Sequence, residues 1–264
     1  MKNNKQLIKS KRHAIVVAIL GVFMLSSCGK RVYTSGTYGA IKSYTAKPEF
    51  RGENDKGTYV SIDLSRGSQE VTNNITDKKA LISIRGHKSI TRKYFNFHYG
   101  LGGTFGNYKF GGPIIDGVND DSKAFYSLNT KTGINLNLPT KRMDWRVIGV
   151  ELVYNYEFGP YQNTLEKVKN SSEDPALLIF NKKSIFSYNF SSEAVFKLNN
   201  DRALGLGFYI GDILNKTGNL KGENSEFIGV FMSFRFKKFT FIVLNESAKE
   251  DIGTSKFGLT YQLF

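Results

Sequence analysis

The chain has 264 residues, and its 37 Lys and Arg against 23 Asp and Glu give a formal net charge of +14 at pH 7. A single cysteine excludes an internal disulfide framework and the zinc and CxxC sites that need several ligands, and the basic residues form no stripe that would indicate a nucleic-acid partner. The 26 Gly, 21 Phe and 14 Tyr against 5 Pro favour strands over helices.

The first predicted element is an export signal over residues 1–27. Residues 2–13 are basic, Ala14 to Leu25 are almost entirely apolar, and Ser26 and Ser27 are small. This order matches the charged, apolar and cleavage regions of a secretory signal. The apolar run of about 12 residues is shorter than the ~20 that a permanent helical anchor needs.

The four residues Leu25-Ser26-Ser27-Cys28 resemble the lipobox of bacterial lipoproteins. In that family the cysteine is acylated, with palmitate among the usual chains, and becomes the first residue of the mature protein. The resemblance therefore implies lipid attachment at Cys28, with residues 28–36 as a lipidated tether. Two or three acyl chains, at ~0.8 kcal/mol per buried CH₂, hold a protein firmly on a membrane.

The residues after the cysteine bear on the destination of the lipoprotein. Gly29 stands where an aspartate would retain an enterobacterial lipoprotein on the inner membrane, so the resemblance implies the outer membrane. The Asn, Lys, Tyr and Phe usage resembles that of the Bacteroidota. Surface-exported lipoproteins of that phylum carry an acidic cluster here, whereas this chain has Lys30 and Arg31. We therefore expect a lipid anchor on the periplasmic leaflet.

The mature region, residues 37–264, predicts a single all-β domain. Its strands alternate with period 2; for example Leu204, Leu206, Phe208 and Ile210 share one face, opposite a glycine-rich face. Expected strands cover approximately 37–50, 57–65, 80–89, 93–110, 122–138, 143–158, 184–198, 202–213, 225–236, 238–246 and 254–264.

Two architectures fit this alternation: a soluble sandwich and an antiparallel up-and-down transmembrane barrel. The barrel is favoured because several runs reach about 10–15 residues, close to the ~9–11 that cross a bilayer on a tilt. Aromatic residues such as Tyr154, Tyr156 and Phe158 end some runs, as in an interfacial girdle. Antiparallel closure favours an even number, whereas these segments number eleven. Either 80–89 lies outside the barrel, which leaves ten strands, or 93–110 forms two strands, which makes twelve; we expect about ten (range 8–12).

Charged residues on the inward parity of these strands predict an interior network. The candidates are His98, Glu151, Glu157, Glu193, Lys197 and Arg235. Arg146 has the opposite parity and is expected at a rim. A salt-bridge network that fills a narrow barrel is the favoured reading of this set, and the lining of a small pore is the alternative.

Catalytic, cofactor and metal sites are not predicted. Gly100, Gly102, Gly103 and Gly106 do not have the GxGxxG spacing of a nucleotide loop. The mature chain has two histidines, and no nucleophile stands at a recognisable spacing from His98.

The sequence thus predicts a lipid-anchored outer-membrane barrel, not an enzyme, with a structural or accessory-subunit role in an envelope complex. Its expected partners are outer-membrane lipid and possible further outer-membrane proteins or lipopolysaccharide. Three alternatives remain open: a narrow solute channel, a periplasmic lipoprotein with a soluble β-sandwich or open barrel, and a lipid-modifying barrel enzyme.

Overall fold

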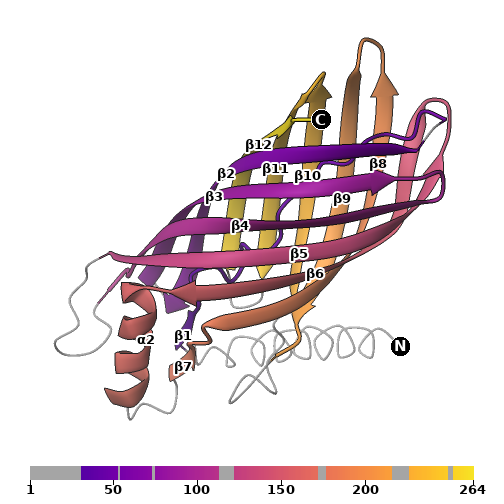
Figure 1. Ribbon diagram of the computed structural model, residues 1–264. Helices are drawn as coiled ribbons and strands as arrows, with labels where there is room; N and C mark the ends of the chain where they lie inside the picture. Colours follow the sequence, from indigo (N-terminus) through magenta and orange to yellow (C-terminus); the bar gives the residue numbers. More distant parts are fainter. Residues whose placement is uncertain are drawn as a thin grey trace, which may run out of the picture.

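The computed structural model describes residues 31–52, 54–72, 75–112, 122–171, 177–215, 226–248 and 252–264. Within these residues, ten antiparallel strands close into one barrel in which each strand pairs with the next along the chain and β12 pairs with β2 (Figure 1). The strands are β2 (Asp55–Thr72), β3 (Ile75–Thr91), β4 (Phe95–Lys109), β5 (Lys123–Pro139), β6 (Met143–Phe158), β8 (Ser184–Leu198), β9 (Arg202–Ile213), β10 (Phe227–Phe236), β11 (Phe239–Ala248) and β12 (Ile252–Gln262).

The predicted fold class and the count of ten strands are confirmed, but the choice of segments was wrong in one place. Residues 80–89 lie inside β3, a full barrel strand, whereas residues 37–50 form no strand. The closed barrel also excludes the soluble sandwich, because the other sheet among the described residues has only two short strands, residues 31–34 and 177–180.

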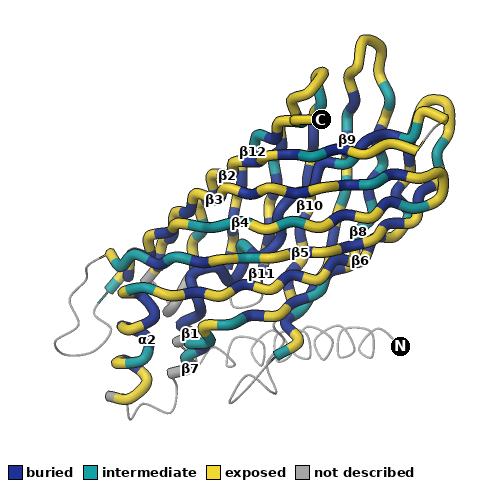
Figure 2. The backbone as a smooth tube through the Cα atoms, viewed as in Figure 1, coloured by how far each residue is buried: buried dark blue, intermediate teal, exposed yellow. Residues whose placement is uncertain are grey.

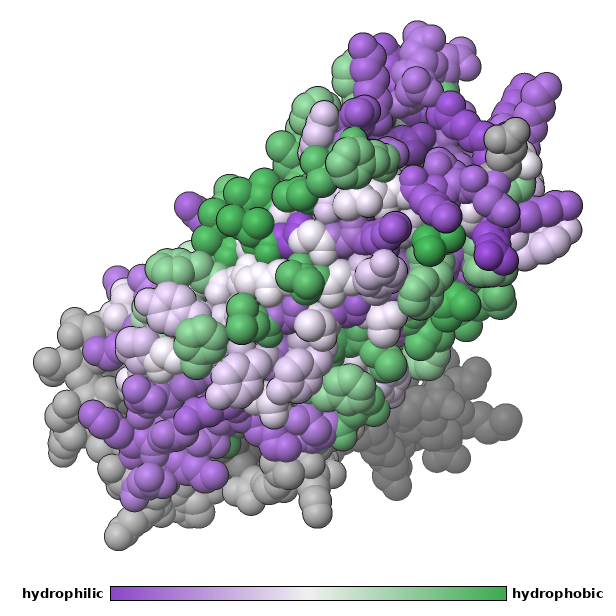
Figure 3. Space-filling view, in the orientation of Figure 1, coloured by the Kyte–Doolittle hydropathy of each residue, from purple (hydrophilic) through white to green (hydrophobic). Residues whose placement is uncertain are grey.

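The barrel is polar inside and apolar outside. Buried and exposed residues alternate along each strand (Figure 2), and the exposed set includes Leu101 at 70% and Phe257 at 60% exposure. Hydrophobic side chains gather over the middle of the strands and hydrophilic ones over both ends (Figure 3). Strands of 10 to 18 residues are long enough to carry this apolar band across a bilayer.

The two rims of the barrel differ in the length of their connections. At one rim, here called the short-turn rim, two or three residues join β3 to β4, β5 to β6, β8 to β9 and β10 to β11. At the other, the long-loop rim, residues 110–122, 159–183 and 214–226 make long connections. The short connections are residues 92–94, 140–142, 199–201 and 237–238.

A small substructure stands at the long-loop rim between β6 and β8. It consists of helix α2 (Pro160–Ser171) and strand β7 (Leu177–Phe180), which pairs in parallel with β1 (Arg31–Thr34). Proline suits the first turn of a helix because its missing N–H would have no partner there. Among the described residues, no helix combines the length and apolarity that a membrane crossing requires.

Candidate functional site

The lumen of the barrel is occupied by residues 35–52, here called the plug segment. The N-terminal trace leaves β1 and passes within the ring of strands before β2 begins (Figure 1). Residues 33–50 are buried or half-buried throughout, including Ser35 and Thr37, which the sequence analysis had assigned to a tether and a strand. The plug segment makes no strand ladder, so side chains of the barrel wall bond its backbone instead.

At the long-loop rim, the plug segment is fixed by Glu157 of β6. The carboxylate accepts hydrogen bonds from the backbone N–H groups of Gly36 and Thr37, each at 2.9 Å, and from the side chain of Gln162 in α2 at 2.5 Å. Gly36 must be small, because a Cβ there would lie 2.5 Å from the buried ring of Phe125.

The same rim is closed by an aromatic cluster. Tyr33, Tyr108, Phe110 and Phe125 pack together with Tyr161 of α2, whose ring stacks on that of Tyr108 at 4.4 Å. The Tyr161 hydroxyl donates to the carbonyl that ends β1 at 2.7 Å. Burial raises the pKa of the Tyr161 phenol well above its usual value, so this hydroxyl remains a donor.

In the middle of the lumen, Glu151 joins the wall to the plug segment. Its carboxylate lies 2.8 Å from the Lys42 ammonium, 2.9 Å from Nε2 of His98 and 3.3 Å from the Thr45 hydroxyl. Lys131 of β5 donates to the same threonine at 2.6 Å. The wall therefore supplies a buried carboxylate, Glu151, and a buried ammonium group, Lys131, and side chains of the plug segment bond to both.

Towards the short-turn rim, Glu193 of β8 gathers a second set of contacts. It lies 2.5 Å from Arg146, 2.9 Å from the Tyr44 hydroxyl and 3.9 Å from Lys47. The expectation that Arg146 lies at a rim, facing away from the network, was wrong. The pairing of β5 with β6 shifts register by one residue at Val147, and this bulge turns Arg146 into the lumen.

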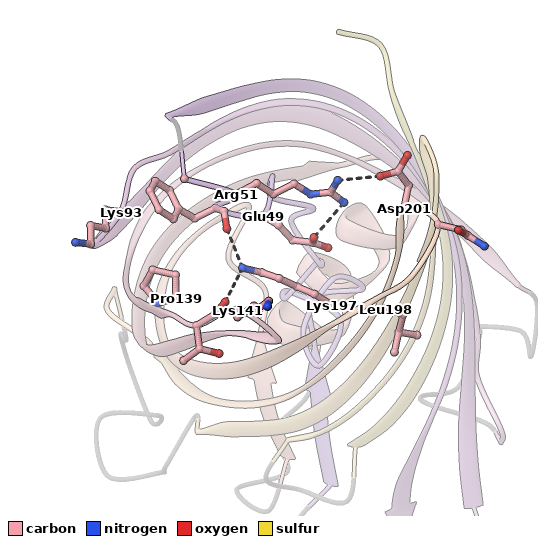
Figure 4. Close-up of a pocket in the computed structure, with 12 residues that line it drawn as sticks. Glu49, Arg51, Lys93, Pro139, Lys141, Lys197, Leu198 and Asp201 are labelled. Atoms are coloured by element: carbon pink, nitrogen blue, oxygen red, sulfur yellow. Dashed lines mark hydrogen bonds and ion pairs between the residues drawn. The ribbon is translucent and has the colours of Figure 1, made fainter.

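The plug segment ends at a pocket of about 640 Å³ in the short-turn rim (Figure 4). Arg51 lies between Asp201, at 2.9 Å, and Glu49, at 3.5 Å, and Lys197 donates to the carbonyl of Phe50 at 2.8 Å. The hydrogen bond to Asp201 raises the pKa of Arg51 and so favours the charged guanidinium.

Little open space remains between the plug segment and the wall. Two cavities in this part of the described structure, one beside Tyr44 and Arg146 and one beside Ile41 and Lys131, measure about 20 Å³ each, which is room for about one water molecule. The lumen is therefore filled along the described path of the chain.

The structure places all six candidate network residues on the inward side. Four of them are 3% exposed or less, while Lys197 and Arg235 are half-buried near the short-turn rim. Arg235 pairs with Glu49 of the plug segment at 2.5 Å, and Lys197 pairs with Asp144 at 2.5 Å. The sequence analysis missed every plug residue that completes this network: Lys42, Tyr44, Thr45, Lys47, Glu49 and Arg51.

The surroundings of His98 bear on the alternative of a barrel enzyme. The His98 ring hydrogen bonds to Glu151, and no described serine or threonine hydroxyl bonds to that ring. Among the described residues, no group of three or more His, Cys, Asp and Glu side chains could hold a metal ion.

No protein-family model matches the chain, and no curated protein matches it. Solved outer-membrane barrels resemble its fold. The translocator domain of the autotransporter NalP from Neisseria meningitidis is 9% identical, with 78% of this chain and 88% of that chain covered and a TM-score of 0.46. The transport unit of the autotransporter AIDA-I from Escherichia coli is 8% identical, with 82% and 93% covered and a TM-score of 0.46.

A third solved structure, the outer membrane protein OprG from Pseudomonas aeruginosa, is 8% identical, with 78% of this chain and 96% of that chain covered and a TM-score of 0.36. At these TM-scores the likenesses carry no argument about function. The chain folds as an outer-membrane β-barrel, which its apolar exterior and polar lumen require independently.

Proposed function

We propose that the protein is a self-plugged outer-membrane barrel lipoprotein with a structural or accessory-subunit role in an envelope complex. The observation that carries this proposal is the filled lumen: Lys42 and Lys47 of the plug segment pair with Glu151 and Glu193 of the wall, and Glu49 of the plug segment pairs with Arg235. A barrel whose interior is occupied by its own chain presents its rims, its loops and its lipid-facing wall to partners, and not a pore.

The channel alternative requires the plug segment to leave. Plug release would separate Lys42 from Glu151 and Glu49 from Arg235 together, and it would expose the buried ring of Tyr44 to water. The lipid-modifying alternative receives no support either, because His98 is enclosed in the lumen away from the lipid.

The anchor of the proposed lipoprotein is an acylated Cys28, for which the lipobox residues Leu25 to Cys28 provide the support. Outer-membrane lipid is thus its first partner, through the acyl chains and the apolar wall. Other outer-membrane proteins or lipopolysaccharide are the proposed further partners of the long-loop rim.

Two measurements test this function. In planar bilayers the full chain should show no steady conductance, while a matched variant that lacks residues 37–50 should conduct. A full chain that conducts as well as the deletion variant would refute the plug. Affinity purification of the tagged chain from detergent-solubilised membranes should recover a stoichiometric companion, and its absence would refute the accessory role.

A further inference from the structure

The path of the plug segment bears on which leaflet holds the lipid anchor. Outer-membrane barrels have short periplasmic turns and longer extracellular loops. The short-turn rim also holds the start of β2 at Asp55 and the end of β12 at Gln262, as expected for a barrel with an even number of strands. The long-loop rim is therefore the extracellular one.

The N-terminal end of the described chain lies at that extracellular rim. β1 pairs with β7 in the connection between β6 and β8, and Tyr33 contacts Phe110 just beyond β4 at 5.9 Å between ring centroids. From there the chain descends through the lumen, with Gly36 at Glu157, Lys42 at Glu151 and Phe50 at Asp144.

These three contacts run antiparallel along a single strand, β6, from its extracellular end to its periplasmic end. The plug segment thus crosses the barrel once, from the long-loop rim to the short-turn rim. The apolar band of a membrane barrel is about 25 Å tall, so the two ends of a chain that crosses it lie at opposite faces of the membrane.

Two residues, Gly29 and Lys30, lie between Cys28 and Arg31. The three residue steps from Cys28 to Arg31, at ~3.3–3.6 Å each when extended, reach about 10 Å, far less than the height of the membrane band. We propose that the acyl chains of Cys28 insert into the outer leaflet, so that the lipoprotein is anchored at the cell surface and not in the periplasmic leaflet that its sequence suggested. This inference rests on the proposed acylation of Cys28.

The test places one epitope tag at three positions of the full chain: between Lys30 and Arg31, within residues 216–225, and between Lys237 and Lys238. Antibody binding is measured on intact cells and again after the outer membrane is permeabilised. We expect the first two tags to be accessible on intact cells and at least tenfold more strongly bound than the third, which becomes accessible only after permeabilisation.

Each other outcome overturns the proposal. A hidden N-terminal tag with an accessible tag at 216–225 refutes the threading, and an accessible tag at Lys237 with the other two hidden refutes the orientation. Acylation is measured separately, by incorporation of labelled palmitate into wild type and Cys28→Ala. Wild type should take up the label and Cys28→Ala should not. No label in wild type, or equal label in both chains, would refute the anchor while preserving the path of the chain.

A different observation, on the lipid-facing wall, supports a second inference. Arg66, Lys78 and Lys109 project outward from β2, β3 and β4 at the extracellular end, just beyond Leu64 and Phe105 of the apolar band. Lys78 is directly opposite Lys109, and Arg66 is diagonal to Lys78.

Like charges in such positions lie about 5–8 Å apart and destabilise a sheet. In the part of the chain that the structure describes, none of these three cations makes a hydrogen bond or an ion pair. They line a hollow of about 790 Å³ together with polar neighbours such as Asn107 and Ser255. The cluster is therefore suited to an anion of the surrounding lipid.

We infer that this cluster, Arg66 with Lys78 and Lys109, binds the phosphates of lipid A, the phosphorylated glycolipid of the outer leaflet. Its height fits a headgroup, since it follows the apolar band by one or two outward-facing residues on each strand. Ammonium and guanidinium groups are the ordinary partners of phosphate.

The test adds bis-phosphorylated lipid A, dephosphorylated lipid A or phosphatidylglycerol to the detergent-solubilised barrel and measures bound lipid by native mass spectrometry. The triple variant R66Q/K78Q/K109Q should bind bis-phosphorylated lipid A at least tenfold more weakly than wild type. Its matched control is K56Q/K88Q, which alters exposed lysines at the periplasmic ends of β2 and β3 and should bind as wild type does.

Retention of lipid A by the triple variant, or equal loss in the control, would overturn the inference. Equal binding of phosphatidylglycerol or of dephosphorylated lipid A would also overturn it, because the site would then not read the lipid A phosphates. Heat-dependent mobility in SDS gels verifies that each variant remains a folded barrel.

Discussion

Replacing Glu151 by glutamine tests how strongly the wall holds the plug segment. The substitution keeps the shape and hydrogen-bonding capacity of the side chain but leaves Lys42, now 2.8 Å from a neutral amide, as a buried cation without its anion. Breaking a buried pair in this way costs about 3 kcal/mol at the lower end of the usual range. Since 1.36 kcal/mol is a factor of ten, the plug should open roughly 100-fold more often.

Hydrogen exchange of the backbone amides of residues 36–50, in detergent micelles, measures this opening directly. Glu246→Gln is the matched control. This buried wall carboxylate accepts a hydrogen bond from the Tyr209 hydroxyl at 2.6 Å and, among the described residues, makes no hydrogen bond or ion pair with the plug segment. The double variant Lys42→Met/Glu151→Gln removes both charges and should return exchange to within about tenfold of wild type. Unchanged exchange in Glu151→Gln, or no recovery in the double variant, would show that this pair does not hold the plug.

Three further substitutions probe the ends of the plug segment by the same exchange measurement. Gly36→Val would force a Cβ to within 2.5 Å of the Phe125 ring, and overpacking of about 1–3 kcal/mol should speed exchange near residue 36 by 5- to 100-fold; normal exchange would mean that the ring yields. Tyr161→Phe removes the donor to the buried carbonyl at the end of β1. A cost of about 1.4 kcal/mol predicts roughly tenfold faster exchange in β1 and no change of exchange in β10. Asp201→Asn should change exchange less than fivefold, since its ion pair with Arg51 is exposed on both sides and such pairs contribute ~0–1 kcal/mol; a larger effect would make that pair a true latch.

The barrel itself could be predicted from the sequence because its wall repeats one simple rule. Each strand has lipid on one side and polar contacts on the other, so apolar and polar residues alternate over its whole length. This parity correctly placed Glu151, Glu157 and Glu193 in the lumen and Leu206, Phe208 and Ile210 outside.

The plug segment was predicted as a strand because a segment outside any sheet can also alternate in side-chain type by chance. Ile41, Ser43 and Thr45 alternate with Lys42, Tyr44 and Ala46, but both sets are buried, since the wall surrounds the segment on all sides. A signal was present in Pro48, whose missing N–H disfavours a central strand, and in the odd total of eleven expected strands.

Arg146 shows a second limit of parity. A single extra residue at Val147 reverses the face of every residue before it in β6, and nothing in the local sequence marks the bulge. Only the partner strands reveal it, because Arg146 pairs with Glu193 of β8, which lies 47 residues later in the chain.

The position of the plug segment and the strength with which it is held have different origins. Its position is set at both ends by carboxylates that accept from backbone N–H groups at 2.9 Å, Glu157 from Gly36 and Asp144 from Phe50. These contacts do not depend on plug side chains, so substitutions along the plug should leave its register unchanged. Its strength comes from the side-chain pairs between them, above all that of Lys42. A variant weakened at Lys42 should therefore open more often yet return to the same register, which keeps the N-terminus at the long-loop rim whenever the lumen is closed.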